Sequence, residues 1–128
     1  MSSVIPSLGE SEYRFACLVW ESEPIGSGRL AQRAQEALGW KRSTSYTVLK
    51  KLCQRGVLVN EDAQVRALVR REAVLQAEAL ALLDKGFEGS LAQLVALCLG
   101  ARPLTKKECK QLKRLLDQAQ EQAGKKGS

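Results

Sequence analysis

The sequence predicts a mainly α protein with a small β component (α+β). An N-terminal winged helix-turn-helix with a β-hairpin wing is followed by C-terminal dimerisation helices. Three helical patterns with short connections, then two short β segments, then further apolar residues at helical spacing predict this class. Of the 128 residues, we assign 1–72 to the winged helix, 73–124 to a helical dimerisation region and 125–128 to a disordered tail.

The first predicted helix begins near Glu10. Its apolar face follows the spacing i, i+3, i+4, i+7 and consists of Tyr13, Ala16, Cys17 and Trp20. Ile25 is expected in a short strand. We expect Ser27 to be the N-cap of the second helix, because a serine side chain can accept a hydrogen bond from the first turn. Gly39 suits the end of that helix.

The third predicted helix runs from about Ser43 to Gln54. Its inward stripe must face the first two helices, because the small domain otherwise has no core, and consists of Ser45, Val48, Leu49 and Leu52. The outward face is therefore left with hydroxyl groups, one aromatic ring and basic side chains. Two β segments follow, at Val57–Asn60 and about Val65–Arg70, with a turn over residues 61–64 between them.

Positive charge is concentrated on and around this third helix. The chain carries a net charge of +6, and residues 39–56 contain five bases and no acid. A localised basic segment is typical of a surface that binds a polyanion, although a solvated helix face is the alternative. Serine and threonine hydroxyls suit contacts with bases and phosphates. The predicted DNA-binding residues are Lys41, Arg42, Ser43, Thr44, Tyr46, Thr47, Lys50, Lys51 and, on the wing, Arg66.

The second half of the chain has apolar stripes on three further helical segments. Thr105–Glu108 is a capping box that opens the last of them. Such short helices bury little alone, so pooling the stripes of two chains is favoured over an intramolecular helix pair. The predicted dimer interface consists of Leu91, Leu94, Val95, Cys98, Leu112, Leu115 and Leu116.

Several classes of function are disfavoured. The chain has no histidine, phosphate-binding glycine loop or nucleophile motif, so we predict no enzyme. Its four cysteines lack paired spacing, so we expect no metal site, no cofactor and mostly buried, reduced thiols, Cys98 included. No apolar run approaches the roughly 20 residues that span a bilayer. Residues 1–6 do not resemble a secretory signal, so we expect a cytoplasmic protein without membrane insertion.

The segment from Trp40 to Leu58 resembles the recognition-helix pattern of the penicillinase repressor family (BlaI and MecI, with the copper-responsive CopY repressors as cousins). The segments 8–20 and 89–95 are similar to that family's first helix and to its dimerisation region, so the resemblance covers about residues 8–118. It implies a homodimeric repressor whose third helix enters the major groove of double-stranded, palindromic operator DNA. Ser43, Thr44 and Thr47 would lie at the groove, with Tyr46 and the flanking bases at the sugar-phosphate backbone.

The chain departs from that family at three places. The wing turn has Glu61 and Asp62, which would repel phosphate unless Arg66 compensates. The family's Asn-Phe cleavage bond aligns with Leu97–Cys98, so a membrane sensor protease is only weakly implied as a partner. The lone Cys109 cannot supply the paired Cys-x-Cys motifs of copper-responsive members. The alternative function is a winged helix that contacts another protein, and a steep salt dependence of binding would exclude it.

Overall fold

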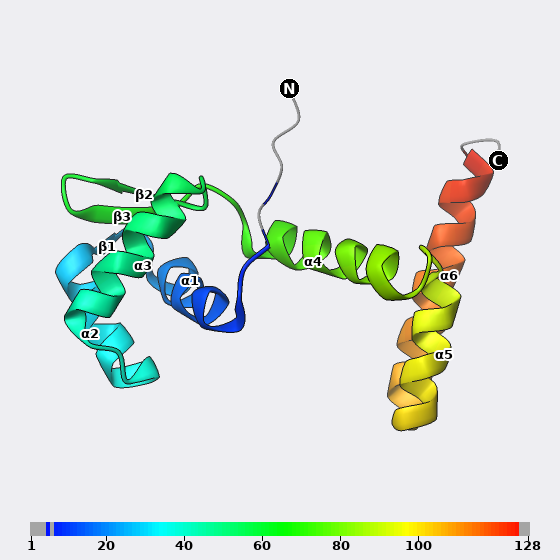
Figure 1. Ribbon diagram of the computed structural model, residues 1–128. Coiled ribbons are helices and arrows are strands. Elements are labelled where there is room, and N and C mark those ends of the chain that lie inside the picture. Colours follow the sequence, from blue (N-terminus) through cyan, green and yellow to red (C-terminus); the bar gives the residue numbers. More distant parts are fainter. Residues whose placement is uncertain (1–4, 6, 126–128) are drawn as a thin grey trace. The chain divides into compact units, whose positions relative to one another are not determined.

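The computed structural model describes Ile5 and residues 7–125 (Figure 1). At Lys125 it describes the backbone only. The chain divides into two compact units, through Leu82 and from Leu83 onward. The first unit has α1 (Glu10–Ser22), β1 (Ile25–Gly26), α2 (Ser27–Leu38), α3 (Arg42–Gln54), β2 (Leu58–Glu61) and β3 (Gln64–Ala67). Helix α4 (Arg71–Gly86) crosses the division, and α5 (Leu91–Ala101) and α6 (Lys106–Lys125) follow. The described helices and the small sheet confirm the mainly α winged-helix class.

A three-stranded antiparallel sheet in the order β1-β3-β2 packs beside the helices of the first unit. Ile25 pairs with Val65, and Leu58 pairs with Ala67. Strand β2 starts one residue later than expected and β3 ends earlier than expected. The turn between them is formed by Asp62 and Ala63 at φ values of 53° and 62°. Positive φ at both central residues is the requirement of a type I′ hairpin turn, which here forms without glycine.

The core lies between α1, α2, α3 and the sheet. Its largest fully buried side chains are Phe15, Val19, Leu30, Leu52, Val57, Leu58, Val65 and Val74. Phe15 also stacks on Trp40, with ring centroids 5.3 Å apart. These contacts anchor all three helices on one set of apolar side chains, which fixes the orientation of α3.

The inward face of α1 differs from the expected one. Phe15, Ala16, Leu18 and Val19 are buried, whereas Tyr13, Cys17 and Trp20 are only partly buried. The reason is that both large aromatic side chains have polar tips. The Trp20 indole N–H donates to the Val69 carbonyl at 2.9 Å, and the Tyr13 hydroxyl accepts from Arg71 Nε at 2.8 Å. Such residues lie at the edge of a core, where the polar tip finds a partner.

The start of α2 also differs from the expected one. The N-cap is Gly26 and Ser27 is the first helical residue, without a side-chain cap. The Ser27 N–H instead donates to the Ala63 carbonyl at 2.8 Å, so the wing turn takes up one amide of this helix start. Gly39 ends the helix in the left-handed conformation at φ 72°, as expected.

The second unit contains α5, α6 and the end of α4. Ser90 caps α5 by accepting from the Gln93 N–H at 3.1 Å. The predicted capping box of α6 is present, because Thr105 Oγ1 accepts from the Glu108 N–H and Glu108 Oε1 accepts from the Thr105 N–H, both at 3.1 Å. Helix α6 continues to Lys125, the first residue of the expected tail. The rest of that tail lies outside the described residues.

Candidate nucleic-acid interface

Helix α3 has two chemically distinct faces. Ser45, Leu49 and Leu52 are buried against the first unit, and Val48 is partly buried. The opposite face is exposed and consists of Ser43, Thr44, Tyr46, Thr47 and Lys50. The predicted orientation of α3 is therefore confirmed. A helix that presents hydroxyls and a lysine, without a carboxylate, has the donor chemistry that base edges and phosphates accept.

The start of α3 adds positive charge to this face. Lys41 is the N-cap, Arg42 is the first helical residue, and both side chains are exposed. The first backbone N–H groups of a helix have no intrahelical acceptor, and the helix dipole adds partial positive charge at the same end. The two basic side chains and these amides together suit a phosphate group.

The start of α2 meets the exposed face of α3 at Gly28, a residue that sequence analysis missed. A Cβ atom at Gly28 would lie 3.8 Å from Arg42 Nη2 and 4.0 Å from the Tyr46 hydroxyl. Gly28, in the first turn of α2, thus lies beside a guanidinium group and a phenol from α3. The glycines around Ser27 were visible in the sequence, but only the packing of α2 on α3 shows which side chains they meet.

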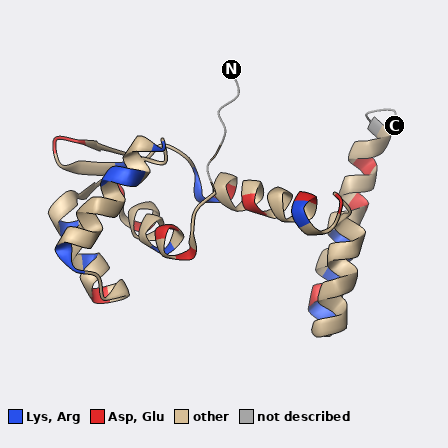
Figure 2. Ribbon diagram, in the orientation of Figure 1, with Lys and Arg blue, Asp and Glu red and all other residues tan. Residues whose placement is uncertain are grey.

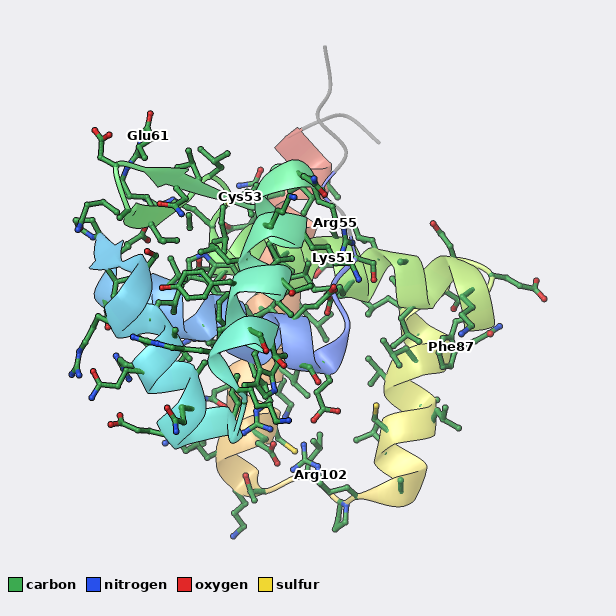
Figure 3. The ribbon with its side chains drawn as sticks, turned by 60° about the vertical axis from the view of Figure 1, so that its left-hand side comes forward. Lys51, Cys53, Arg55, Glu61, Phe87 and Arg102 are labelled. Atoms are coloured by element: carbon green, nitrogen blue, oxygen red, sulfur yellow. The ribbon has the colours of Figure 1, made fainter. Side chains whose placement is uncertain are left out.

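Lys51 lies closer to α1 than the sequence suggested. Its ammonium nitrogen forms an ion pair with Glu12 Oε2 at 3.1 Å, and Arg55 Nη1 lies 3.1 Å from Glu12 Oε1. Figure 3 labels both basic residues near the end of α3. Burial acts to raise the pKa of Glu12, but the Gly9 N–H and the Lys51 and Arg55 side chains outweigh it, so the pKa is lowered. The Lys51 charge is therefore partly neutralised.

The wing contributes little net positive charge. Arg66, predicted to contact DNA, forms an ion pair with Glu61 on the neighbouring strand. Asp62 is exposed in the turn. Figure 2 shows the acidic residues of the hairpin apart from the basic residues of α3. The positive charge of this surface therefore comes from α3 and its N-terminal flank.

A family model described as "Penicillinase repressor" matches residues 8–118, most of the chain. The chain belongs to the penicillinase repressor family. A comparison with curated proteins found no match. The family consists of DNA-binding transcriptional repressors, so DNA is the partner class of this penicillinase repressor homologue and its function is the regulation of transcription.

In this penicillinase repressor homologue, the second unit has no core of its own. None of the described residues from Leu83 to Gly124 is buried. Helices α5 and α6 line an apolar groove of about 620 Å³, to which five of the predicted interface residues contribute: Leu94, Val95, Cys98, Leu112 and Leu115. The other two, Leu91 and Leu116, are 58% and 65% exposed outside the groove. The structure brings most of the predicted interface together on one surface.

The cysteines differ from the expectation of mostly buried thiols. Cys17, Cys53 and Cys109 are partly buried, and Cys98 is exposed. Cys98 was expected in a helical core, but α5 has no buried residue and its apolar side faces the groove. Burial still raises the pKa of Cys53, although the Asn60 N–H acts to lower it. Within the described residues, no cluster of three or more potential metal ligands occurs.

The segment that aligns with the family's cleavage bond lies inside α5. Leu97 is 63% exposed, and the Leu97–Cys98 bond is part of the continuous helix Leu91–Ala101.

Across the described part of the chain, no helix is both long enough and apolar enough to cross a membrane.

Proposed function

We propose that this chain is a homodimeric, cytoplasmic and sequence-specific repressor that places α3 in the major groove of a palindromic operator. The observation that carries this proposal is the division of α3 into a buried stripe and an exposed face of hydroxyls and bases. A groove-binding helix needs an apolar anchor on one side and donors without carboxylates on the other. The first unit supplies both.

Within this proposal, Ser43, Thr44 and Thr47 contact base edges. Lys41, Arg42, Tyr46 and Lys50 contact the backbone phosphates, with the start of α2 at Gly28 as an additional phosphate site. Lys51 and Arg66 contribute less, because each is already paired with a carboxylate. The absence of a strongly basic wing leaves α3 and its flank as the main source of affinity.

The dimer part of the proposal is supported by the second unit. A unit whose apolar side chains are all at least partly exposed has little burial to offset the entropy of ordering its chain. A second copy is the simplest partner, because its own α5–α6 groove is equally uncovered. A two-fold axis then pairs two α3 helices, which matches the symmetry of a palindromic site.

The test uses a duplex selected in vitro from random DNA for tight binding to the wild-type protein. We expect Thr44→Ala/Thr47→Ala to reduce the preference for the selected over a random duplex by about tenfold or more, because each lost base contact removes discrimination. Lys50→Gln should weaken binding to both duplexes and lower the slope of log K against log salt by about one per protomer. Ser11→Ala, at an exposed position of α1, is the control. Unchanged preference in the double variant would refute the role of α3.

An apolar groove beside α3 favours one alternative, contact with another protein. It has a volume of about 470 Å³ and lies between α3 and β2, where Tyr46, Leu58 and Leu68 are among its lining residues. Leu68 is 55% exposed. Binding through such a groove would change little with ionic strength, whereas phosphate-driven binding falls steeply. A salt titration of duplex binding therefore separates the two functions.

A further inference from the structure

The first half of α6 has an exposed basic face that the proposed role of α3 does not use. Residues 106–114 contain five bases and one acid. The bases are all exposed and recur at spacings of three, four and seven residues, so they share one side of the helix: Lys106, Lys107, Lys110, Lys113 and Arg114. Figure 2 shows basic residues on the first turns of α6. We call this surface the α6 basic face.

The α6 basic face is arranged against the intrinsic preferences of a helix. The start of a helix is the positive end of its dipole, where acidic side chains are favourable and basic ones are not. In α6 the lysines lie at the start, whereas Asp117 and Glu121 lie further along. Like charges three and four residues apart, such as Lys106 with Lys110, also repel. A bound polyanion would offset both costs.

The neighbouring acid does not neutralise these bases. Glu108 accepts from the Thr105 N–H at 3.1 Å and forms an ion pair with Arg102 at 3.1 Å. The Thr105 N–H and the Arg102 guanidinium lower the pKa of Glu108, so it stays charged and engaged with these groups. Within the described residues, none of the five bases on the α6 basic face forms an ion pair.

The apolar side of α6 fixes where this face points in a dimer. Leu112 and Leu115 line the α5–α6 groove, and by helical spacing they lie opposite Lys106 and Lys110. A second copy that covers the groove therefore leaves Lys106 and Lys110 exposed, although Arg114 also lines the groove. Each protomer contributes one such face, so the dimer would present two.

We propose that the α6 basic face binds the phosphate backbone of duplex DNA, as a second surface separate from α3. Duplex DNA is favoured over an acidic protein because the family already binds it. A row of lysines also suits a repeating phosphate charge rather than a specific sequence, since the one adjacent hydroxyl, that of Thr105, already accepts from the Glu108 N–H. This surface adds affinity without adding base recognition. The inference rests on DNA as the partner, but it does not require that α3 contacts bases.

The test compares two double variants of the full chain that lose the same net charge. Lys107→Gln/Lys110→Gln changes the α6 basic face, and Arg14→Gln/Lys85→Gln removes two exposed bases from α1 and α4. Binding to a random-sequence duplex is measured by fluorescence anisotropy over a range of salt concentrations. We expect the α6 variant to lower the slope of log K against log salt by about 2 or more, at ~0.9 per lost phosphate contact. The control should stay close to wild type.

Two further measurements separate the possible outcomes. The melting temperature of the α6 variant should equal or exceed that of the wild type, because the substitutions relieve repulsion at the helix start. The α6 variant should keep the wild-type preference for the selected duplex, which distinguishes this surface from α3. If the Thr44→Ala/Thr47→Ala test failed, the result for the salt slope would still stand. Equal slopes in both double variants would overturn the proposal. If the α6 variant lost binding to polyglutamate but kept the wild-type slope of log K against log salt for DNA, the partner would be an acidic protein and the proposal would be overturned.

Discussion

Residues 7–82 and residues 83–124 differ in whether they form a buried apolar core. The first region buries Phe15, Leu52 and their neighbours completely around one core. The second region has a similar supply of leucines, yet Leu91, Leu115 and Leu116 remain more than half exposed. The difference predicts that the winged-helix region is stable as a single chain, whereas the α5–α6 region needs a partner surface.

The comparison is tested most strongly by truncating the core of the first region. Phe15 is fully buried and stacks on Trp40, so Phe15→Ala removes both burial and an aromatic contact. We expect a loss of about 3–5 kcal/mol in the free energy of unfolding. Chemical denaturation followed by Trp fluorescence measures it. Arg14→Ala, one residue earlier and exposed, is the control, and an equally small effect at both positions would contradict the assigned core.

A polar substitution in the α5–α6 groove tests the other half of the comparison. Leu112 lines the groove and is 36% exposed. Leu112→Asp would place a charge in an apolar interface twice per dimer, so the dimer dissociation constant should rise at least about 100-fold, or ~2.7 kcal/mol. Analytical ultracentrifugation measures the change, with Gln118→Glu as the control. A monomeric wild-type protein, or an unaffected variant, would rule out this interface.

Sequence periodicity predicted the first region best where one helix face had to be apolar. The orientation of α3 followed from the i, i+3, i+4, i+7 spacing of Ser45, Val48, Leu49 and Leu52. Periodicity could not place the polar tips of Tyr13 and Trp20, because their partners lie 58 and 49 residues away. The pairing of Lys51 with Glu12 was missed for the same reason. These contacts depend on how α1 packs against α3 and against the segment from Val69 to Arg71, which no local pattern encodes.

The Glu12 cluster offers a smaller, pH-dependent test within the first region. Its lowered pKa means that the folded state prefers the charged carboxylate. The resulting stabilisation is fully present above the unfolded pKa of about 4.3 and is lost as the pH falls through the folded value. We expect Glu12→Gln to destabilise the protein by about 1–2 kcal/mol at pH 7, from the loss of charged hydrogen bonds. The difference from wild type should vanish at acid pH.

Urea denaturation at a series of pH values measures this effect. Glu10→Gln, at an exposed position in the first turn of the same helix, is the matched control. A Glu12→Gln effect that persists unchanged below pH ~3 would show that the side chain acts through packing rather than charge.

The smallest expected effect is in the wing turn, where a substitution tests the backbone conformation of the first region. Ala63 adopts φ 62°, a conformation that costs an L-residue with a Cβ about 1–2 kcal/mol and glycine almost nothing. Glycine also loses more chain entropy on folding, by roughly 0.5–1 kcal/mol, so Ala63→Gly should stabilise the first region by about 0.5–1 kcal/mol. Thermal unfolding measures the gain.

Ala37→Gly, at an exposed position within α2, should instead destabilise by about 1 kcal/mol, because there the backbone is helical. Opposite signs at the two alanines would show that the turn is set by the pairing of β2 with β3, which imposes the type I′ geometry on a sequence without its preferred glycine.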